Sequence, residues 1–213
     1  LLWRHRSFQF GALAVVLTFA AVMGTFFLLP FYLEEIFSLP PKTVGWMLAV
    51  LSITNALVSP LGGLGGDRWG NLLVLRLGAG LIVGGLGGLL WLGPQASQGV
   101  LVVILALTGA GFGLFQAPNL NEMLLGVQPQ ASGLAAGTNA VLKNVGALLG
   151  IALMVTMVSL GGKGPQGAPA EQCLAWSCFQ RAFILGAVLG GLNLALNLLP
   201  RGRAPAPGRR MTK

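Results

Sequence analysis

Six apolar runs divide this sequence, and each is close to the length that crosses a lipid bilayer. A membrane-spanning helix needs about 20 predominantly apolar residues. The runs occupy residues 10–33, 43–64, 71–92, 99–118, 132–160 and 181–199. Only 8% of the chain is charged, whereas a soluble domain carries about a quarter charged residues. The sequence therefore predicts an all-α membrane protein with six transmembrane helices.

The placement of basic residues predicts how these helices are oriented. Cytoplasmic loops of membrane proteins carry an excess of Lys and Arg. If the N-terminus is cytoplasmic, most basic residues fall on or near that side, and three fall on the other. The first group is Arg4, Arg6, Arg68, Arg76, Arg201, Arg203, Arg209, Arg210 and Lys213, and the second is Lys42, Lys163 and Arg181. We therefore expect a plasma-membrane protein with both termini in the cytoplasm and no affinity for nucleic acid, despite the net charge of +8.

The same pattern predicts the domain organisation. Residues 1–200 form one transmembrane domain in this interpretation, and residues 201–213 form a basic, disordered tail. The chain begins at Leu1 and not at Met, so we expect a fragment of a longer protein. The basic start is followed by an apolar run that is too long for a signal peptide.

No set of residues in the sequence has the spacing of a catalytic or metal site. The one histidine, His5, lies in the basic N-terminal flank, and there is no phosphate-binding loop and no cluster of metal ligands. We expect neither enzymatic activity nor a cofactor nor a metal. Cys173 and Cys178 leave two alternatives open, a disulfide or two separate thiols.

A short polar stretch separates the second and third apolar runs. Residues 59–71 contain five glycines together with Asp67 and Arg68. We expect a tight reversal here, which Gly70 and the preceding glycines permit. Asp67 is expected to precede a helix, where its charge meets the positive end of the helix dipole. Arg68 is expected to lie at the inner headgroups.

Lys143 lies inside the fifth apolar run. A charged side chain within a bilayer is costly, and it usually faces a partner or a water-filled cavity. Asn139 lies one helical turn earlier on the same face. Two interpretations are open: Lys143 extends to the inner headgroups, or it faces a cavity and there binds an anionic group or responds to a proton.

Three further polar residues are candidates for a cavity or for proton coupling. Asn55 lies in the second run, Gln116 lies in the fourth, and Glu122 follows the fourth. Uncharged polar groups either line a path or form hydrogen bonds between helices. Glu122 either pairs with a basic residue at the inner surface or is a solvated loop acid.

Glycines that lie four residues apart predict close packing between helices. Such rows are Gly80, Gly84 and Gly88, then Gly133 and Gly137, then Gly146 and Gly150, and finally Gly186 and Gly190. A second interpretation is that these faces slide during transport. Gly109, Gly111 and Gly113 are spaced by two, which favours a locally flexible helix.

Three stretches resemble the major facilitator superfamily. Residues 63–70, Gly-Leu-Gly-Gly-Asp-Arg-Trp-Gly, are similar to the loop signature that joins the second and third helices of a six-helix half. Residues 30–33 are similar to the end of the first helix in the drug:proton antiporters. Residues 131–152 look like the penultimate helix of the 14-span exporters, where an Arg is usual at the Lys143 position. The signature usually ends in two basic residues, and Asn71 and Leu72 stand there instead.

The resemblance implies half of a major facilitator fold, in which two inverted three-helix repeats make up the six helices. It implies proton-coupled export of small amphipathic compounds by alternating access, with substrate bound between this half and a missing N-terminal half. Gly63, Asp67, Arg68 and Gly70 would then form a gating loop. A metabolite carrier of the same superfamily and a membrane scaffold without transport activity remain alternatives.

Overall fold

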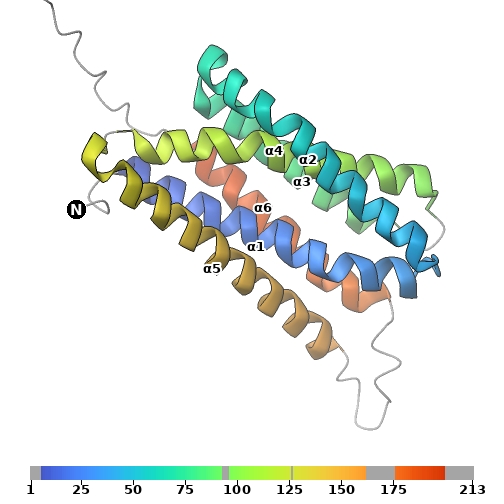
Figure 1. Cartoon of the computed structure of the whole chain (residues 1–213). Coiled ribbons are helices and arrows are strands. Elements are labelled where there is room, and N and C mark those ends of the chain that lie inside the picture. The colour runs from blue at the N-terminus through green and yellow to red at the C-terminus, as the bar shows by residue number, and fades with distance from the viewer. Residues whose placement is uncertain (1–5, 93–95, 126, 162–175, 200–213) are drawn as a thin grey trace, which may run out of the picture.

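The computed structural model describes residues 6–92, 96–125, 127–161 and 176–199 as a bundle of helices (Figure 1). The α-helices are α1 (Arg6–Glu35), α2 (Pro41–Trp69), α3 (Asn71–Trp91), α4 (Gln98–Leu124), α5 (Ser132–Gly161) and α6 (Trp176–Leu198), and a short 3-10 turn, η2 (Pro129–Ala131), precedes α5. All six helices are long and apolar enough to cross a membrane. The predicted fold class is confirmed.

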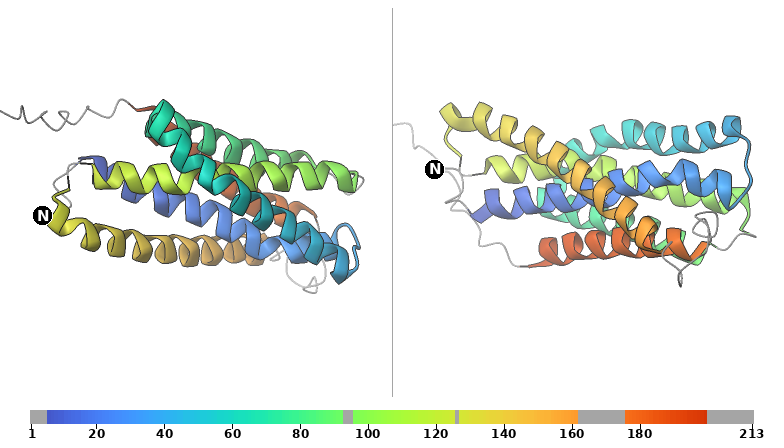
Figure 2. Two further views of the ribbon diagram at one scale, coloured as in Figure 1. Left: turned by 45° about the horizontal axis from the view of Figure 1, so that its top comes forward. Right: turned by 90° about the horizontal axis from the view of Figure 1, so that it is seen from below.

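The helices alternate in direction along the bundle. α1, α3 and α5 begin at one end, called the near end below, and α2, α4 and α6 begin at the far end (Figure 1). α1 packs mainly against α5 and α6, and α4 packs mainly against α2 and α3. The partners of α1 in the second three helices thus correspond to the partners of α4 in the first three. Two related three-helix repeats produce this pattern. α1 and α4 also contact each other, while α2 and α5 lie on opposite flanks (Figure 2).

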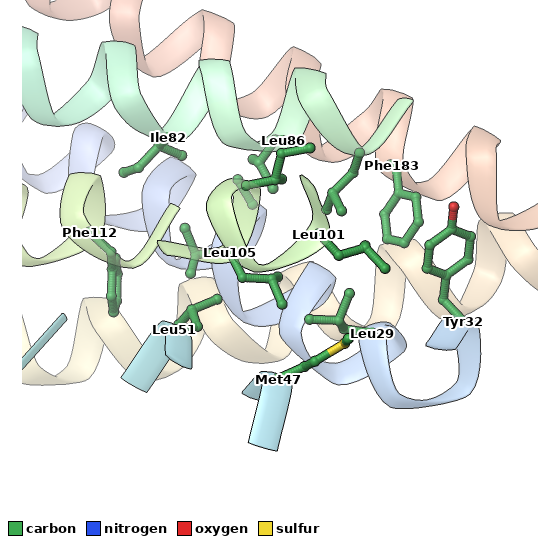
Figure 3. Packing of buried hydrophobic residues seen from close by; sticks show 14 of the residues in the cluster. Leu29, Tyr32, Met47, Leu51, Ile82, Leu86, Leu101, Leu105, Phe112 and Phe183 are labelled. Atoms are coloured by element: carbon green, nitrogen blue, oxygen red, sulfur yellow. The ribbon is translucent and has the colours of Figure 1, made fainter. Parts of the chain in front are cut away.

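Buried apolar side chains of α1, α2, α3, α4 and α6 meet in one large core, against which Leu142 of α5 packs (Figure 3). At its far end Tyr32 of α1 is fully buried and lies edge-on against Phe183 of α6, with ring centroids 5.0 Å apart. The Tyr32 hydroxyl donates to the carbonyl oxygen of Leu92 at 3.1 Å. Tyr32 therefore ties α1 both to the end of α3 and to α6.

α1 is the most buried helix, and its two buried threonines form their hydrogen bonds within the helix itself. The hydroxyls of Thr18 and Thr25 donate to the carbonyl oxygens of Ala14 and Ala21, one turn earlier in the same helix, each at 2.8 Å. Neither threonine needs a neighbouring helix for this bond. Polar residues can therefore occupy the centre of the bundle without a polar partner from elsewhere.

Gly109, Gly111 and Gly113 of α4 allow close backbone contact on two faces. A Cβ atom on Gly113 would lie 2.8 Å from the carbonyl oxygen of Asn55 in α2. A Cβ atom on Gly111 would lie 2.7 Å from the carbonyl oxygen of Gly78 in α3. The helix continues without a break through all three glycines. Their spacing by two therefore serves two packing faces.

The predicted rows of glycine are correct for some helices and wrong for others. Gly146 and Gly150 of α5 pack against the backbone of Val16 and Ala20 in α1. Four other glycines of these rows have no neighbouring atom within 4 Å of an added Cβ, and these are Gly80, Gly84, Gly133 and Gly137. A spacing of four shows that glycines share a face of a helix. It does not show which face is covered.

Two predicted helix ends are also wrong. α2 continues to Trp69, and Gly70, whose φ is +91°, is the only residue between it and α3. Asp67 therefore lies in the last turn of α2, at the negative end of that helix dipole, and not ahead of a helix as expected. α4 continues past Pro118 to Leu124, because prolines are tolerated inside membrane helices.

The contact between α1 and α5 gives a test of the packing. We expect Gly150→Ala to lower the free energy of unfolding by about 1–3 kcal/mol, because the added Cβ meets the carbonyl oxygen of Ala20. Gly137→Ala in the same helix meets nothing within 4 Å and is the matched control. Thermal unfolding in detergent measures both variants. Equal midpoints for the two would contradict this packing.

Candidate functional site

Lys143 lies half-buried where α5 meets α1 and α4. Its Nζ donates to the side-chain oxygen of Gln116 in α4 at 3.2 Å. It also lies 5.4 Å from the ring centroid of Phe19 in α1, which in turn packs edge-on against Phe112 with centroids 5.0 Å apart. An amide oxygen and an aromatic face both attract an ammonium group. Partners from two other helices therefore hold the charge of Lys143.

This site is deep in the bundle. Lys143 is eleven residues after Ser132, which places it about 16 Å along α5 at the rise of an α-helix. Gln116 and Phe19 are, like Lys143, only partly buried. The cluster of Lys143, Gln116 and Phe19 is called the lysine site below. It combines a cation, an amide and an aromatic ring, which suits an amphipathic ligand with an acceptor group.

Asn139 and Glu122 are buried and lie nearer to the near end than Lys143. Asn139 is 4% exposed, and its side-chain oxygen lacks a hydrogen-bond partner among the described residues. Glu122 lies inside α4 and is 7% exposed. The expectation that Glu122 follows the fourth helix as a loop residue is therefore wrong, because α4 continues past Pro118.

Asn55 is not brought to the lysine site. It is partly buried where α2 and α4 approach closely, and its side-chain oxygen lies against Gly113 without a hydrogen-bond donor among the described residues.

Two residues near the lysine site were not predicted from the sequence, Phe19 and Asn119. Asn119 is 1% exposed and donates to the carbonyl oxygen of Gly11 at 3.2 Å. Asn119 lies three residues from both Gln116 and Glu122, and this spacing indicates that the three residues share one side of the helix.

The predicted gating loop lies at the near end of the bundle. Asp67 and Arg68 are exposed in the last turn of α2, and neither has an ion-pair partner in the part of the chain that the structure describes. Gly63 is partly buried, and a Cβ there would lie 4.0 Å from Ala117. The charges of the loop are thus accessible to a partner outside these helices.

Of the two cysteines, only Cys178 lies within the described residues. It is buried near the start of α6. Cys173 lies outside the described residues, so the structure tests neither the disulfide nor the two separate thiols.

α2 and α5 bury much less of their apolar surface than the other helices. Only 17% of the most apolar stretch of each is buried, against 33% to 61% for the other four. They lie on opposite flanks of α1 and α4 (Figure 2). Two flanking helices with apolar, uncovered faces leave a surface available to lipid or to another set of helices.

Comparison with known proteins agrees with this architecture. The family model described as Major Facilitator Superfamily matches residues 1–151. A riboflavin transporter of Clostridioides difficile is 30% identical over 151 residues, which is 71% of this chain and 33% of that protein. A lincomycin resistance protein of Listeria monocytogenes is 24% identical over 93% of this chain and 44% of its own length.

A third relative is a multidrug resistance protein of Mycobacterium tuberculosis, which is 25% identical over 74% of this chain and 29% of that protein. The chain therefore spans between 29% and 44% of the length of these three curated relatives.

The hydrogen bond within the lysine site can be tested by its effect on stability. Gln116→Leu removes the acceptor for the Lys143 ammonium, and we expect it to lower the free energy of unfolding by about 1 kcal/mol. Gln98→Leu, at an exposed position in the first turn of α4, is the control and should have little effect. Thermal unfolding in detergent measures the difference. A Gln116→Leu protein as stable as the control would contradict the bond.

Proposed function

The chain belongs to the Major Facilitator Superfamily, and from that membership we propose that it is one six-helix half of a secondary active transporter. Its six apolar helices make it a multi-pass membrane protein. Substrate would bind between this half and a second one, and rocking of one half against the other would give alternating access. In this proposal the near end lies on the cytoplasmic side of the plasma membrane, since Arg68 and Arg76 lie toward that end.

The partner proposed is the N-terminal half of the same transporter. The low burial of α2 and α5 supports it, because a second bundle laid across α1 and α4 would cover both flanks. The length of the relatives supports it as well, since each is more than twice as long as this chain. In isolation, the 213 residues would not transport.

The proposed activity is proton-coupled export of small amphipathic compounds. The observation that carries it is the lysine site, where an ammonium lies beside an amide and an aromatic ring about 16 Å along α5. Lys143 would bind an acceptor group of the substrate, and Phe19 would contact its apolar part. Relatives named for lincomycin and multidrug resistance support a substrate of this kind.

The gating loop of Gly63, Asp67, Arg68 and Gly70 would hold the cytoplasmic side closed. Asp67 and Arg68 are exposed at the near end, within reach of the proposed partner half. An ion pair formed across the two halves would favour the outward-facing state, and breaking it would let the cytoplasmic side open.

A metabolite carrier is the second candidate. The relative named as a riboflavin transporter favours it, because riboflavin is itself a small ring compound with polar groups. Uptake and export assays on the whole gene distinguish the two. A membrane scaffold would show neither activity and would instead co-purify with a stoichiometric partner.

Substitution of the buried cation tests the proposed substrate site. In the whole transporter we expect Lys143→Ala to reduce proton-gradient-dependent export about tenfold, which corresponds to about 1.4 kcal/mol. Lys42→Ala, at an exposed position in the first turn of α2, is the matched control and should keep full activity. Dye or antibiotic accumulation in cells is the measurement. Equal activity of the two variants would exclude Lys143 from the site.

The gating loop is tested by removing its negative charge. We expect Asp67→Asn to slow export several-fold while leaving the amount of protein in the membrane unchanged, because the residue is exposed and its loss affects closure only. Glu34→Gln, an exposed acid in the last turn of α1, is the control. Normal export by Asp67→Asn would remove the gating role.

A further inference from the structure

The contact between α1, α4 and α5 encloses two amide groups that protein donors leave unsatisfied. Asn119 is 1% exposed and Asn139 is 4% exposed. The Oδ1 atom of each is buried and has no hydrogen-bond partner among the described residues. The Asn119 Nδ2 donates to Gly11 of α1 at 3.2 Å, which fixes that amide between the helices. Buried acceptors of this kind are normally satisfied by protein or by ordered water.

The two asparagines lie at the same depth. Met123 of α4 and Ala135 of α5 pack in one cluster with α1 near the near end. α4 and α5 run in opposite directions. One helical turn away from the near end, the next residue on each of these two faces is Asn119 on α4 and Asn139 on α5. The Asn119 Nδ2 lies 3.7 Å from the Met123 sulfur, so these two residues share one face of α4.

The next turn on both helices carries the lysine site. Gln116 lies three residues from Asn119, Lys143 lies four residues from Asn139, and Gln116 and Lys143 are joined by their hydrogen bond of 3.2 Å. Polar side chains thus form two successive layers, which begin one turn beyond Met123 and Ala135 and continue toward the middle of the bundle. The four residues Gln116, Asn119, Asn139 and Lys143 are called the polar column below.

We propose that the polar column holds a file of water molecules that connects the Lys143 amine with the solution at the near end. Each asparagine oxygen accepts a hydrogen bond from one water molecule, and the Lys143 Nζ supplies donors at the deep end. Buried waters commonly make about three such bonds. The column gives Lys143 access to protons, a role that rests on the proposed proton-coupled transport.

Each proton transfer along this file breaks one bond to hydrogen and forms another. An Nζ–H bond of Lys143 breaks, its electron pair stays on the nitrogen, and the proton forms an O–H bond on the first water. That water passes a proton to the next one, and the last releases it to the solution. The reverse sequence charges the amine again. No oxidant, reductant or metal is needed.

Few titratable groups of the described residues lie near Lys143 on the helices that pack against α5. From α1 the described side chain that faces it is Phe19, and η2 contributes no titratable group. From α4 there is Glu122, one turn from Asn119 toward the near end, and it alone is buried among the acids of the described residues. From α6, Cys178 and Arg181 lie at the far end. Glu122 is therefore the acidic side chain that lies nearest in register to the near-end side of the column.

A sodium ion or another permanently charged cation fits the polar column less well than water does. The two asparagine oxygens resemble the ligands of a sodium ion, but the Lys143 ammonium is one turn away on the same helix. Like charges at that distance repel, and Lys143 can lose its charge only by giving up a proton. Water accommodates both forms of the amine.

Hydroxyl-radical labelling of the whole transporter in lipid discs tests for the water file. X-rays generate radicals from water in place, and methionine sulfur beside that water is converted to the sulfoxide. Met123 and Met154 are both 0% exposed, but Met123 adjoins the polar column, whereas Met154 packs in a cluster with Leu28 and Ala182. We expect Met123 to be oxidised several times faster than Met154. Equally slow oxidation of both would overturn the proposal.

Exchange of the Lys143 amine protons with water tests the role of the file. In protein labelled with ¹⁵N-lysine, Asn139→Leu should slow this exchange several-fold at Lys143 and leave the exposed Lys42 unchanged. Asn144→Leu, at an exposed position on the same helix, is the control. Unchanged exchange at Lys143 would overturn the proposal. Neither measurement requires transport, so a transporter found to move substrate without protons would refute the proposed coupling and leave these results standing.

Discussion

Close contact between helix backbones is the constraint on which this bundle depends. Lipid is as apolar as leucine, so burial of apolar side chains gives little drive for helices to associate within a membrane, and packing must supply it. Gly111 and Gly113 bring α4 against α3 and α2, and Gly146 and Gly150 bring α5 against α1. These contacts set the spacing of the helices, and the spacing sets what lies beside the buried polar groups.

The lysine site shows how that spacing produces chemistry. Gly146 lies less than one turn from Lys143 on α5 and faces the backbone of Val16 in α1. The close approach of α1 brings Phe19 beside the ammonium, while Gln116 reaches it from α4. A cation that would be costly alone in lipid is held by a ring, an amide and, in our proposal, water. Packing between helices thus makes a charge tolerable inside an apolar bundle.

Much of the fold could be predicted from the sequence because length and hydropathy alone determine a membrane helix. The ends of helices could not, since Pro118 and the glycines around residues 62–66 are helix breakers in water and are accommodated here within α4 and α2. Lys143 stood out because its charge is expensive in lipid. Asn119 did not, because an uncharged amide becomes noticeable only when its burial and its missing donor are known.

The position of α1 has a consequence for how the protein is made. Among the described helices α1 is synthesised before the other five, yet it packs chiefly against α4, α5 and α6, which follow later in the chain. It must therefore remain in the lipid for most of the time that synthesis takes. The hydroxyls of Thr18 and Thr25 are bonded within α1 itself, so these two groups are paired before the later helices are made. Assembly of this half is then completed only when its last helix arrives.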